Sequence, residues 1–456
     1  MALIVALCLL FPTGPLPANR AFALSIEEEK IMGQKFFAQI NSYFNLLDDG
    51  FAEQYISDIG RYLITPLEPK YFPFDFHIIK ENSLNAFAGP GGHIFFFSGL
   101  IAGMEEVDEL AAVMCHEIGH ISARHLAKRI ELNKKIGIAT LAGVLAAIFV
   151  GGEAGGGLAV GSMAAGMQAQ LHYSRKDERQ ADQLGFKYMK AGGFDPKGML
   201  VTLNKIERGS WYGTDKIPPY LLTHPTGPER MSNLDSLLMD FKADPPKKEA
   251  LRFRRLFPFF KTVVIAKTFD LRDAERLFER DLQKSPDSSL PYFGLGIVKA
   301  EKSEYGQAVR YLKKAMERKP DFAPIMSRLG EAYQLNGQDR EAVSILKKSL
   351  QEDEKDKSAL FFLGLSYENI KEYEKAIRVF EELTSGTYVK NDVYYHLGIS
   401  YGRRNMLGYA HLNFGIYFKN LGEIRKAAFH FRKAEEHSGN NSALKRKISR
   451  SRQALR

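Results

Sequence analysis

The sequence HEIGH at residues 116–120 places two histidines and a glutamate within five positions. On a helix with 3.6 residues per turn, His116 and His120 project about 40° apart, so both imidazoles can reach one metal ion. Zinc binds imidazole nitrogen, and in catalytic sites it keeps one position for a water molecule. Glu117 lies about 60° from His120 around the helix, where its carboxylate can take a proton from that water. The motif therefore predicts a catalytic centre with one zinc ion per chain.

The residues before the motif predict the helix that this spacing requires. Apolar side chains recur there at helix-compatible intervals and give the segment one buried face: Leu110, Val113, Met114 and Ile118. His125 is the nearest further histidine, but a continuing helix would turn it about 140° from His120. The metzincin pattern also requires a glycine where this chain has Ala123. We therefore expect His125 to be a structural residue and not a ligand.

A second charged segment, SRKDERQADQLG at residues 174–185, contains candidates for the rest of a zinc site. Glu178 and Asp182 are four residues apart, so on a helix they share one face. Glu178 is our candidate for the third ligand. Asp182 is placed to accept a hydrogen bond from the free ring nitrogen of a ligating histidine. Taken alone, however, the segment fits an exposed charged helix better, because other charged residues surround this pair.

The second half of the chain contains an internal repeat. Leu-Gly-x-x-Tyr begins at Leu329, Leu363 and Leu397, a period of 34 residues that is typical of tetratricopeptide helix pairs. The similar sequence FGIYF at 414–418 comes only half a period later, so one helix should belong to two successive units. Stacked pairs form a concave surface, which we expect to bind an extended segment or a partner; a solenoid that only scaffolds is the alternative.

The domain boundaries follow from these patterns. A chain of 456 residues with 45% hydrophobic residues exceeds one ordinary core and should form two or three domains. The proline- and lysine-rich sequence near residue 245 predicts a break between them. We expect a metal-site domain at residues 24–243 and a linker at 244–250. A repeat solenoid should follow at 251–440, and a basic tail at 441–456.

Two terminal features bear on location. Residues 1–23 are similar to a cleavable export signal, although the segment lacks a basic start; an uncleaved anchor or a misplaced start codon would also explain it. At the other end, six Lys or Arg residues follow Glu436 and account for most of the formal net charge of +9. We expect a solvated, frayed terminus in preference to contact with an anionic membrane, and no nucleic-acid partner.

An uncharged apolar run of about 17 residues, 136–152, is at the lower limit for a membrane-spanning helix. The glycines that follow it suit close packing or mobility better than a second span. We therefore expect a buried or substrate-facing helical hairpin. An integral-membrane enzyme would need several spans that the hydropathy does not supply.

The motifs HEIGHISARH and SRKDERQADQLG together resemble the M48 family of zinc metallopeptidases over residues 24 to about 240. This resemblance implies an α+β, gluzincin-like domain, mostly helical with a small sheet, followed by an all-α tetratricopeptide solenoid. It also implies that Glu178, which precedes an alanine-aspartate pair by three residues, is the third zinc ligand. The whole chain is similar to bacterial periplasmic M48 peptidases with tetratricopeptide repeats. That similarity implies an exported endopeptidase, unfolded outer-membrane proteins as polypeptide substrates, and contact of the repeats with the barrel assembly machinery.

Two further segments fit the same family. The sequence NAFAGPGGHIFFFSGLI, residues 85–101, should hold substrate as an added strand at an edge formed by residues 93–97; a buried core strand is an equal interpretation. In THPTGPER, residues 223–230, His224 could be a fourth, inhibitory zinc ligand and Arg230 could stabilise the oxyanion. The rival function from another class is a chaperone or assembly factor with little or conditional proteolysis.

Overall fold

The computed structural model describes residues 24–132, 173–208, 218–239, 241–242, 244–384 and 390–453. The expected export signal and the apolar run at 136–152 lie outside these ranges. Within them, no helix combines the length and the apolar character needed to span a membrane.

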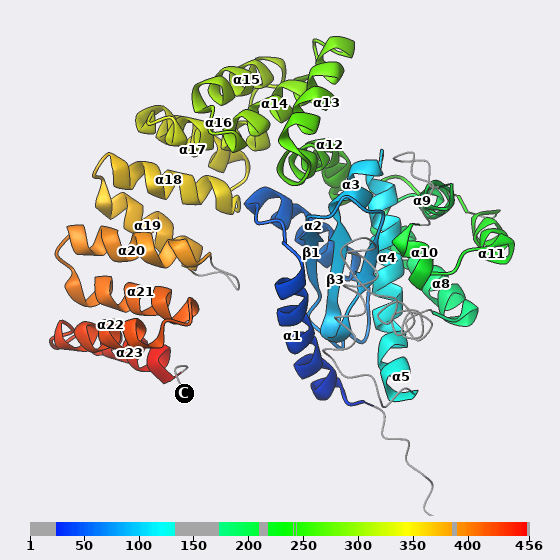
Figure 1. Ribbon diagram of the computed structural model, residues 1–456, viewed down its shortest axis with the longest axis horizontal. Helices are drawn as coiled ribbons and strands as arrows, with labels where there is room; N and C mark the ends of the chain where they lie inside the picture. Colours follow the sequence, from blue (N-terminus) through cyan, green and yellow to red (C-terminus); the bar gives the residue numbers. More distant parts are fainter. Residues whose placement is uncertain are drawn as a thin grey trace, which may run out of the picture.

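The N-terminal half contains the mixed α and β structure that was expected, with one small sheet among helices (Figure 1). Its elements are α1 (Ile26–Tyr43), α2 (Gly50–Leu63), β1 (Asp75–Ile79), β2 (Ala86–Ala88), the 3-10 helix η1 (Pro90–Gly92), β3 (His93–Phe97), α3 (Ser98–Gly103), α4 (Val107–Ser122), α5 (His125–Leu132), α8 (Arg175–Gly192), α9 (Lys197–Glu207), α10 (Pro219–Thr223) and α11 (Pro228–Met239).

The sheet is sandwiched between helices. Its strand order is β1-β3-β2, with β1 parallel and β2 antiparallel to β3. Phe95 and Phe97 of β3 pack with Phe36 on the α1 side, whereas Ile94 and Phe96 belong to the core shared with α2 and α4. The expectation that β3 is an edge strand is therefore wrong, and the core-strand alternative is confirmed. An unbroken apolar run suits a strand that is covered on both faces.

The C-terminal half is entirely helical in the described residues and forms an arc of antiparallel helix pairs (Figure 1). Its elements are α12 (Lys248–Thr268), α13 (Leu271–Lys284), α14 (Ser289–Glu301), α15 (Tyr305–Arg318), α16 (Ala323–Leu335), α17 (Asp339–Glu352), α18 (Lys357–Asn369), α19 (Tyr373–Thr384), α20 (Asn391–Arg403), α21 (Leu407–Asn420), α22 (Ile424–Glu436) and α23 (Ser442–Gln453).

The glycine of the Leu-Gly-x-x-Tyr sequence recurs every 34 residues because it lies where the two helices of each repeat pack most closely. A Cβ atom on Gly330 would lie 2.3 Å from Leu346, and one on Gly364 would lie 2.5 Å from Phe380, so only glycine lets the paired helices approach this closely. Gly415 of α21 has the same relation to Phe431 of α22, at 2.7 Å. Because Gly398 of α20 has this relation to Phe414 of α21, also at 2.7 Å, α21 serves two successive units, and the expected half-period slip is confirmed.

The helix after the expected linker belongs to both halves. α12 packs on α2 and α3 and also on α14. Its Phe260 stacks on Tyr55 with ring centroids 4.3 Å apart, and the Tyr55 hydroxyl donates to the Phe253 carbonyl at 2.9 Å. The proline-rich segment is thus followed directly by a shared, buried interface, so a fragment beginning near residue 250 would expose the apolar face of α12.

The solenoid also returns to the N-terminal half at Asp49. This carboxylate is buried; it caps α2 by accepting from the Ala52 amide at 3.1 Å and pairs with Arg328 of α16 at 2.5 Å and Lys267 of α12 at 3.2 Å. Burial alone would raise the pKa of Asp49, but the two cations hold it well below its ordinary value of 3.8. Asp49 therefore stabilises the fold fully above the pKa that its carboxyl has in the unfolded chain. This stabilisation is lost as the pH falls towards the lower pKa of the same carboxyl in the folded protein.

We expect Asp49→Ala to lower the free energy of unfolding by about 3–5 kcal/mol, because it removes the α2 cap and leaves Arg328 buried without its carboxylate. Urea denaturation followed by circular dichroism measures the loss. The double variant Asp49→Ala/Arg328→Met removes the stranded charge and should recover part of it. Asp48→Ala, which removes the exposed neighbouring carboxylate, is the matched control; an equal effect of the two single variants would contradict this clamp.

Candidate metal centre

Two glycines let α4 and α8 pack closely enough for their side chains to converge. A Cβ atom on Gly119 of α4 would lie 2.8 Å from the Ala181 carbonyl oxygen, and one on Gly185 of α8 would lie 3.3 Å from the His116 amide nitrogen. α8 begins at a capping box in which the Ser174 side chain accepts from the Asp177 amide and the Asp177 side chain accepts from that of Ser174. The polar sequence SRKD therefore fixes where α8 starts. The next turn of α8, which carries Glu178, packs against α4.

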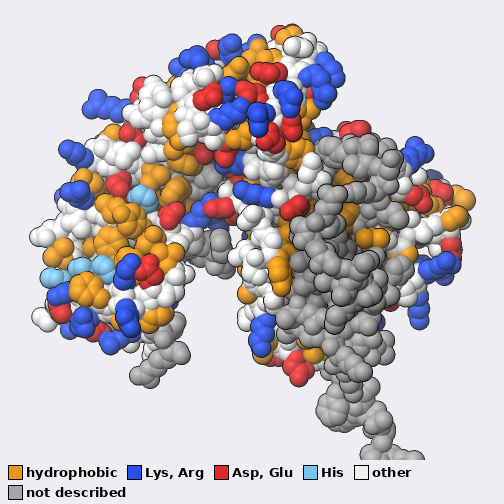
Figure 2. Space-filling model, in the orientation of Figure 1, with side chains coloured by type: hydrophobic (Ala, Val, Ile, Leu, Met, Phe, Trp, Pro, Cys, Tyr) orange, Lys and Arg blue, Asp and Glu red, His pale blue; other side chains and the backbone are white. Residues whose placement is uncertain are grey.

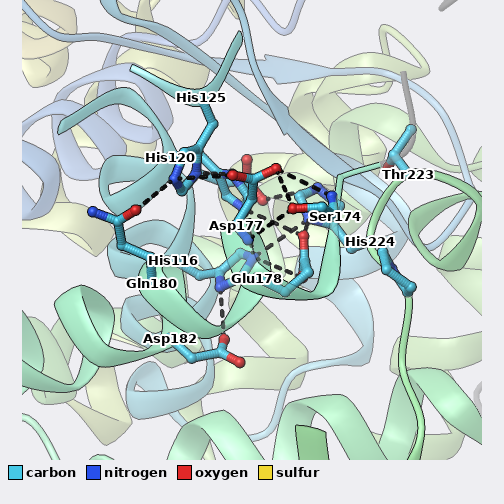
Figure 3. A network of polar contacts seen from close by, with 12 residues as sticks. His116, His120, His125, Ser174, Asp177, Glu178, Gln180, Asp182, Thr223 and His224 are labelled. Atoms are coloured by element: carbon cyan, nitrogen blue, oxygen red, sulfur yellow. Dashed lines mark hydrogen bonds and ion pairs between the residues drawn. The ribbon is translucent and has the colours of Figure 1, made fainter. Parts of the chain in front are cut away.

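Four side chains meet in one buried cluster (Figure 3). His116 and His120 lie on α4 and Glu178 lies on α8, while His224 directly follows α10. His116 Nε2 lies 3.0 Å from His120 Nε2 and 3.3 Å from His224 Nδ1. Glu178 Oε1 lies 3.1 Å from His224 Nδ1 and 3.4 Å from His120 Nε2. One atom from each residue lies within 4.8 Å of those from the other three.

The donor set and its spacing fit zinc. Nitrogen ligands at roughly 2.0 Å around a tetrahedral zinc are separated by about 3.3 Å, close to the spacings seen here. Both Glu117 oxygens are buried and have no hydrogen-bond partner among the described residues; Oε1 lies 3.5 Å from His224 Nε2. A bound ion and its water would give these groups the partners that burial otherwise denies them.

The charges around the cluster favour a cation within it. Burial would raise the pKa of Glu178, but Arg230, His224 and hydrogen bonds from the two α4 histidines hold it well below its usual value. Burial would lower the pKa of His116, yet hydrogen bonds to Asp182 and Glu178 raise it to about 9. The ionised carboxylates of Glu178 and Asp182 therefore favour a bound cation, while burial holds the pKa of His120 well below its ordinary value.

Each α4 histidine has a second partner on its other ring nitrogen. His116 Nδ1 lies 2.9 Å from Asp182 Oδ1, the arrangement expected from the sequence. His120 Nδ1 lies 3.0 Å from His125 Nδ1, and His125 Nε2 contacts Gln180 Oε1 at 3.1 Å. The expected continuous helix does not exist here, because Arg124 has a left-handed φ of 54° and separates α4 from α5. Because of this break, the His125 ring lies beside the His120 ring and can orient it. His125 is not one of the four residues of the cluster.

Asp182→Asn tests the first of these contacts. The loss of a carboxylate partner on His116 should weaken zinc binding about tenfold, because outer partners fix ligand orientation and raise ligand basicity. Competition with a chelator at fixed pH measures the affinity. Asp235→Asn makes the same charge change at an exposed position of α11 and should leave affinity unchanged. Equal affinities of the two variants would argue against the assigned role.

Arg230 lies between the carboxylates of Asp182 and Glu178 and also lines the pocket formed with residues 225–229. Its Nε and Nη2 donate to the two oxygens of Asp182, each at 2.9 Å, and its Nη1 lies 2.5 Å from Glu178 Oε2. These contacts commit most of the guanidinium donors, and the expected contact with an oxyanion stays a prediction. Holding the two carboxylates in place is the role that this geometry favours.

Two tyrosines that the sequence did not single out also border the cluster. The Tyr173 ring lies 3.9 Å from that of His120, and Tyr220 stacks on His224 at 4.4 Å. Burial raises the pKa of both phenols above the ordinary value, so each keeps its proton near neutral pH. Tyr173 also donates its backbone N–H to the Thr223 carbonyl at 3.0 Å, which places His224 beside the other three residues.

A small sheet covered by helices, with HExxH on α4 and a glutamate on α8, defines a metallopeptidase domain of the zincin type. Residues 52–238 match the sequence profile of "Peptidase family M48". Residues 299–360 and 358–385 match two tetratricopeptide profiles. The chain therefore carries an M48 metallopeptidase domain followed by tetratricopeptide repeats.

Several known proteins are similar to parts of the chain. The β-barrel assembly-enhancing protease of Yersinia pestis is 32% identical over 225 residues, which are 49% of this chain and 46% of that protein. The mitochondrial metalloendopeptidase OMA1 of Schizosaccharomyces pombe is 27% identical over 49% of this chain and 65% of its own length. A crystal structure of MamA protein is 21% identical over 38% of this chain and 86% of its own, with a TM-score of only 0.28. The chain thus spans about half the length of the first of these relatives.

Proposed function

We propose that this chain is an exported, zinc-dependent endopeptidase of the bacterial periplasm that degrades misfolded or stalled outer-membrane proteins. The observation that carries the catalytic part is the buried cluster of His116, His120, Glu178 and His224 beside Glu117, whose oxygens have no hydrogen-bond partner among the described residues. Support for the outer-membrane part comes from relatives that are named for β-barrel assembly.

The residues around the cluster have distinct roles in this proposal. Zinc bound there would supply a Lewis acid and lower the pKa of a water molecule. Glu117 takes the proton from the attacking water and passes it to the leaving amine. Asp182 and His125 orient the two α4 imidazoles, while Arg230 fixes Asp182 and Glu178. Either Tyr173 or Tyr220, each still protonated at neutral pH, can donate to the developing oxyanion.

An extended substrate has a suitable edge in β2. This strand pairs with β3 on one side, no described strand pairs with its other side, and it packs on α4. A polypeptide added there would run beside the helix that carries Glu117, with its main chain held by the edge hydrogen bonds. The substrate strand in this proposal therefore adds to residues 86–88 and not to residues 93–97, which form the central strand.

The solenoid in this proposal recruits substrate or the barrel assembly machinery. Its arc curves around towards the peptidase half (Figure 1). Partly exposed aromatic side chains occur on its successive helices, including Tyr395 of α20, which lies 5.8 Å from Phe414 and 5.2 Å from Tyr417 of α21 between ring centroids. Adjacent aromatic side chains of this kind suit binding of an unfolded polypeptide.

A substrate trap in cells tests the proposal. Glu117→Gln should retain envelope polypeptides that copurify with the full chain, whereas His116→Ala, which removes a ligand, should retain fewer. Enrichment of outer-membrane proteins on the trap supports the proposed substrates, and cytoplasmic proteins alone would contradict them. Full complementation of a deletion strain by Glu117→Gln would instead favour the chaperone alternative, because that variant keeps the fold but lacks the base.

A further inference from the structure

The positive charge of the chain is concentrated in the last two described helices of the solenoid. Residues 424–453 contain nine Lys and Arg against two Glu, whereas the whole chain has a formal net charge of +9. Figure 2 shows Lys and Arg side chains around apolar and histidine side chains at this end of the arc. These thirty residues, α22 and α23 with their connection, therefore hold most of the excess charge.

The last helix is a folded platform for these charges. Leu444 and Ile448 of α23 are buried against α21 and α22, so the expectation of a frayed tail is wrong for residues 442–453. Relative to this packed face, Arg446 and Arg450 project from the opposite side of the helix, and Lys445 projects to one flank. All three are exposed and have no ion-pair partner within the described part of the chain.

Solubility alone does not explain this arrangement. A helix face that is exposed to water needs polar side chains, but side chains of both signs satisfy that need. The first helix of the solenoid region after α12 shows the usual pattern: exposed Arg272 and Arg276 of α13 pair with Asp270 and Asp273. The outer face of α23 has no acidic residue to balance its cations. It therefore presents a surface of one sign that attracts polyanions.

Exposed apolar side chains accompany these charges. Leu421, Ile424 and Phe429 are 50%, 49% and 44% exposed and lie in or beside α22. Arg432 lies over the Phe429 ring at 5.8 Å. Basic side chains next to exposed apolar ones suit the interface of a bilayer, where lipid phosphates meet acyl chains. A nucleic-acid backbone uses the charges but leaves Leu421 and Ile424 in water.

We propose that α22 and α23 form a docking surface for an anionic lipid bilayer. The inference goes beyond the proposed peptidase function and relies on it only for the choice of occupant, because an exported protein meets lipid phosphates and not nucleic acids. Each cation near an anionic surface strengthens binding independently, and the attraction decays within a Debye length. Binding is consequently weak, reversible and sensitive to salt, and it orients α22 and α23 towards the membrane.

Flotation of the purified full chain with vesicles tests the proposal. We expect binding to vesicles of phosphatidylglycerol and phosphatidylcholine, weak binding to phosphatidylcholine alone, and release by salt. Removing four cations in Lys445→Ser/Arg446→Ser/Lys447→Ser/Arg450→Ser should lower the partition coefficient at least about tenfold. The matched control, Arg272→Ser/Arg276→Ser/Arg280→Ser/Lys284→Ser, removes the same charge from α13 and should change it by less than roughly threefold. Both variants leave the apolar run at 136–152 intact.

Three results would overturn the proposal. Equal losses in the two quadruple variants would show that only overall charge matters. Loss of binding in Arg446→Lys/Arg450→Lys would indicate a defined phosphate-binding site, because point charges suffice at a membrane surface. Tighter binding to a DNA duplex than to the vesicles at equal phosphate concentration, lost in the α23 variant, would assign the face to nucleic acid. Cleavage of a soluble unfolded protein should be the same in all variants, so failure of this test is distinguishable from failure of the proposed function.

Discussion

Glu117→Gln is expected to lower the rate of cleavage by about 10²–10⁴-fold while zinc stays fully bound. Glu178→Ala and His116→Ala should lose both zinc and activity. The reason is that a ligand supplies metal affinity, whereas the base acts only on the water. Glu117 fits the second role, since its oxygens are buried beside the cluster but it is not one of the four residues whose atoms converge.

Zinc content by elemental analysis and cleavage of an unfolded substrate separate the two effects. Glu105→Gln makes the same chemical change at a carboxylate that is 77% exposed near the start of α4 and should behave as wild type. Circular dichroism checks that each variant is folded. Full zinc occupancy after Glu178→Ala would remove that residue from the site, and zinc loss after Glu117→Gln would make Glu117 a ligand instead of the base.

The parts of the centre that helical periodicity determines could be predicted from the sequence. A separation of four residues on one helix brings His116 and His120 together, and the same separation places Asp182 behind Glu178. Each pair needs only a local conformation to be correct. The pairing of the two helices is a longer-range fact; it depends on the close approach at Gly119 and Gly185, which a single sequence does not reveal.

The missed features depend on irregular backbone or on distant contacts. His125 becomes a partner of His120 only because Arg124 adopts a left-handed conformation, which is uncommon for residues other than glycine. The Asp49 to Arg328 pair joins residues 279 apart in sequence. Neither periodicity nor composition carries such information. The edge position of residues 93–97 failed for a related reason, since strand order in a sheet is set by packing and not by the strand's own residues.

We propose that His224 occupies the position that a catalytic water would need. Its Nδ1 lies 3.1–3.3 Å from Glu178 Oε1 and His116 Nε2, distances that the other ligand atoms also keep. The side chain is almost fully buried and stacks on Tyr220. The residues that follow, Pro225 to Gly227, line a surface pocket that also contains Glu178. A neutral imidazole held there would complete four protein ligands and exclude the nucleophile.

His224→Ala should therefore raise the basal cleavage of an unfolded substrate by about 10- to 100-fold, if the open state is a minor conformer populated at roughly 1–10%. Zinc should remain bound by the other three residues. His437→Ala, which removes an exposed histidine from the solenoid, is the matched control and should leave the rate unchanged. Self-cleavage offers a second measurement on the same preparations. A lower or unchanged rate at full zinc occupancy would contradict the lid and leave His224 as a contact for substrate or oxyanion. An increase lost again in His224→Ala/Glu117→Gln would show that the released activity uses the same base, because opening the lid exposes the centre without replacing its chemistry.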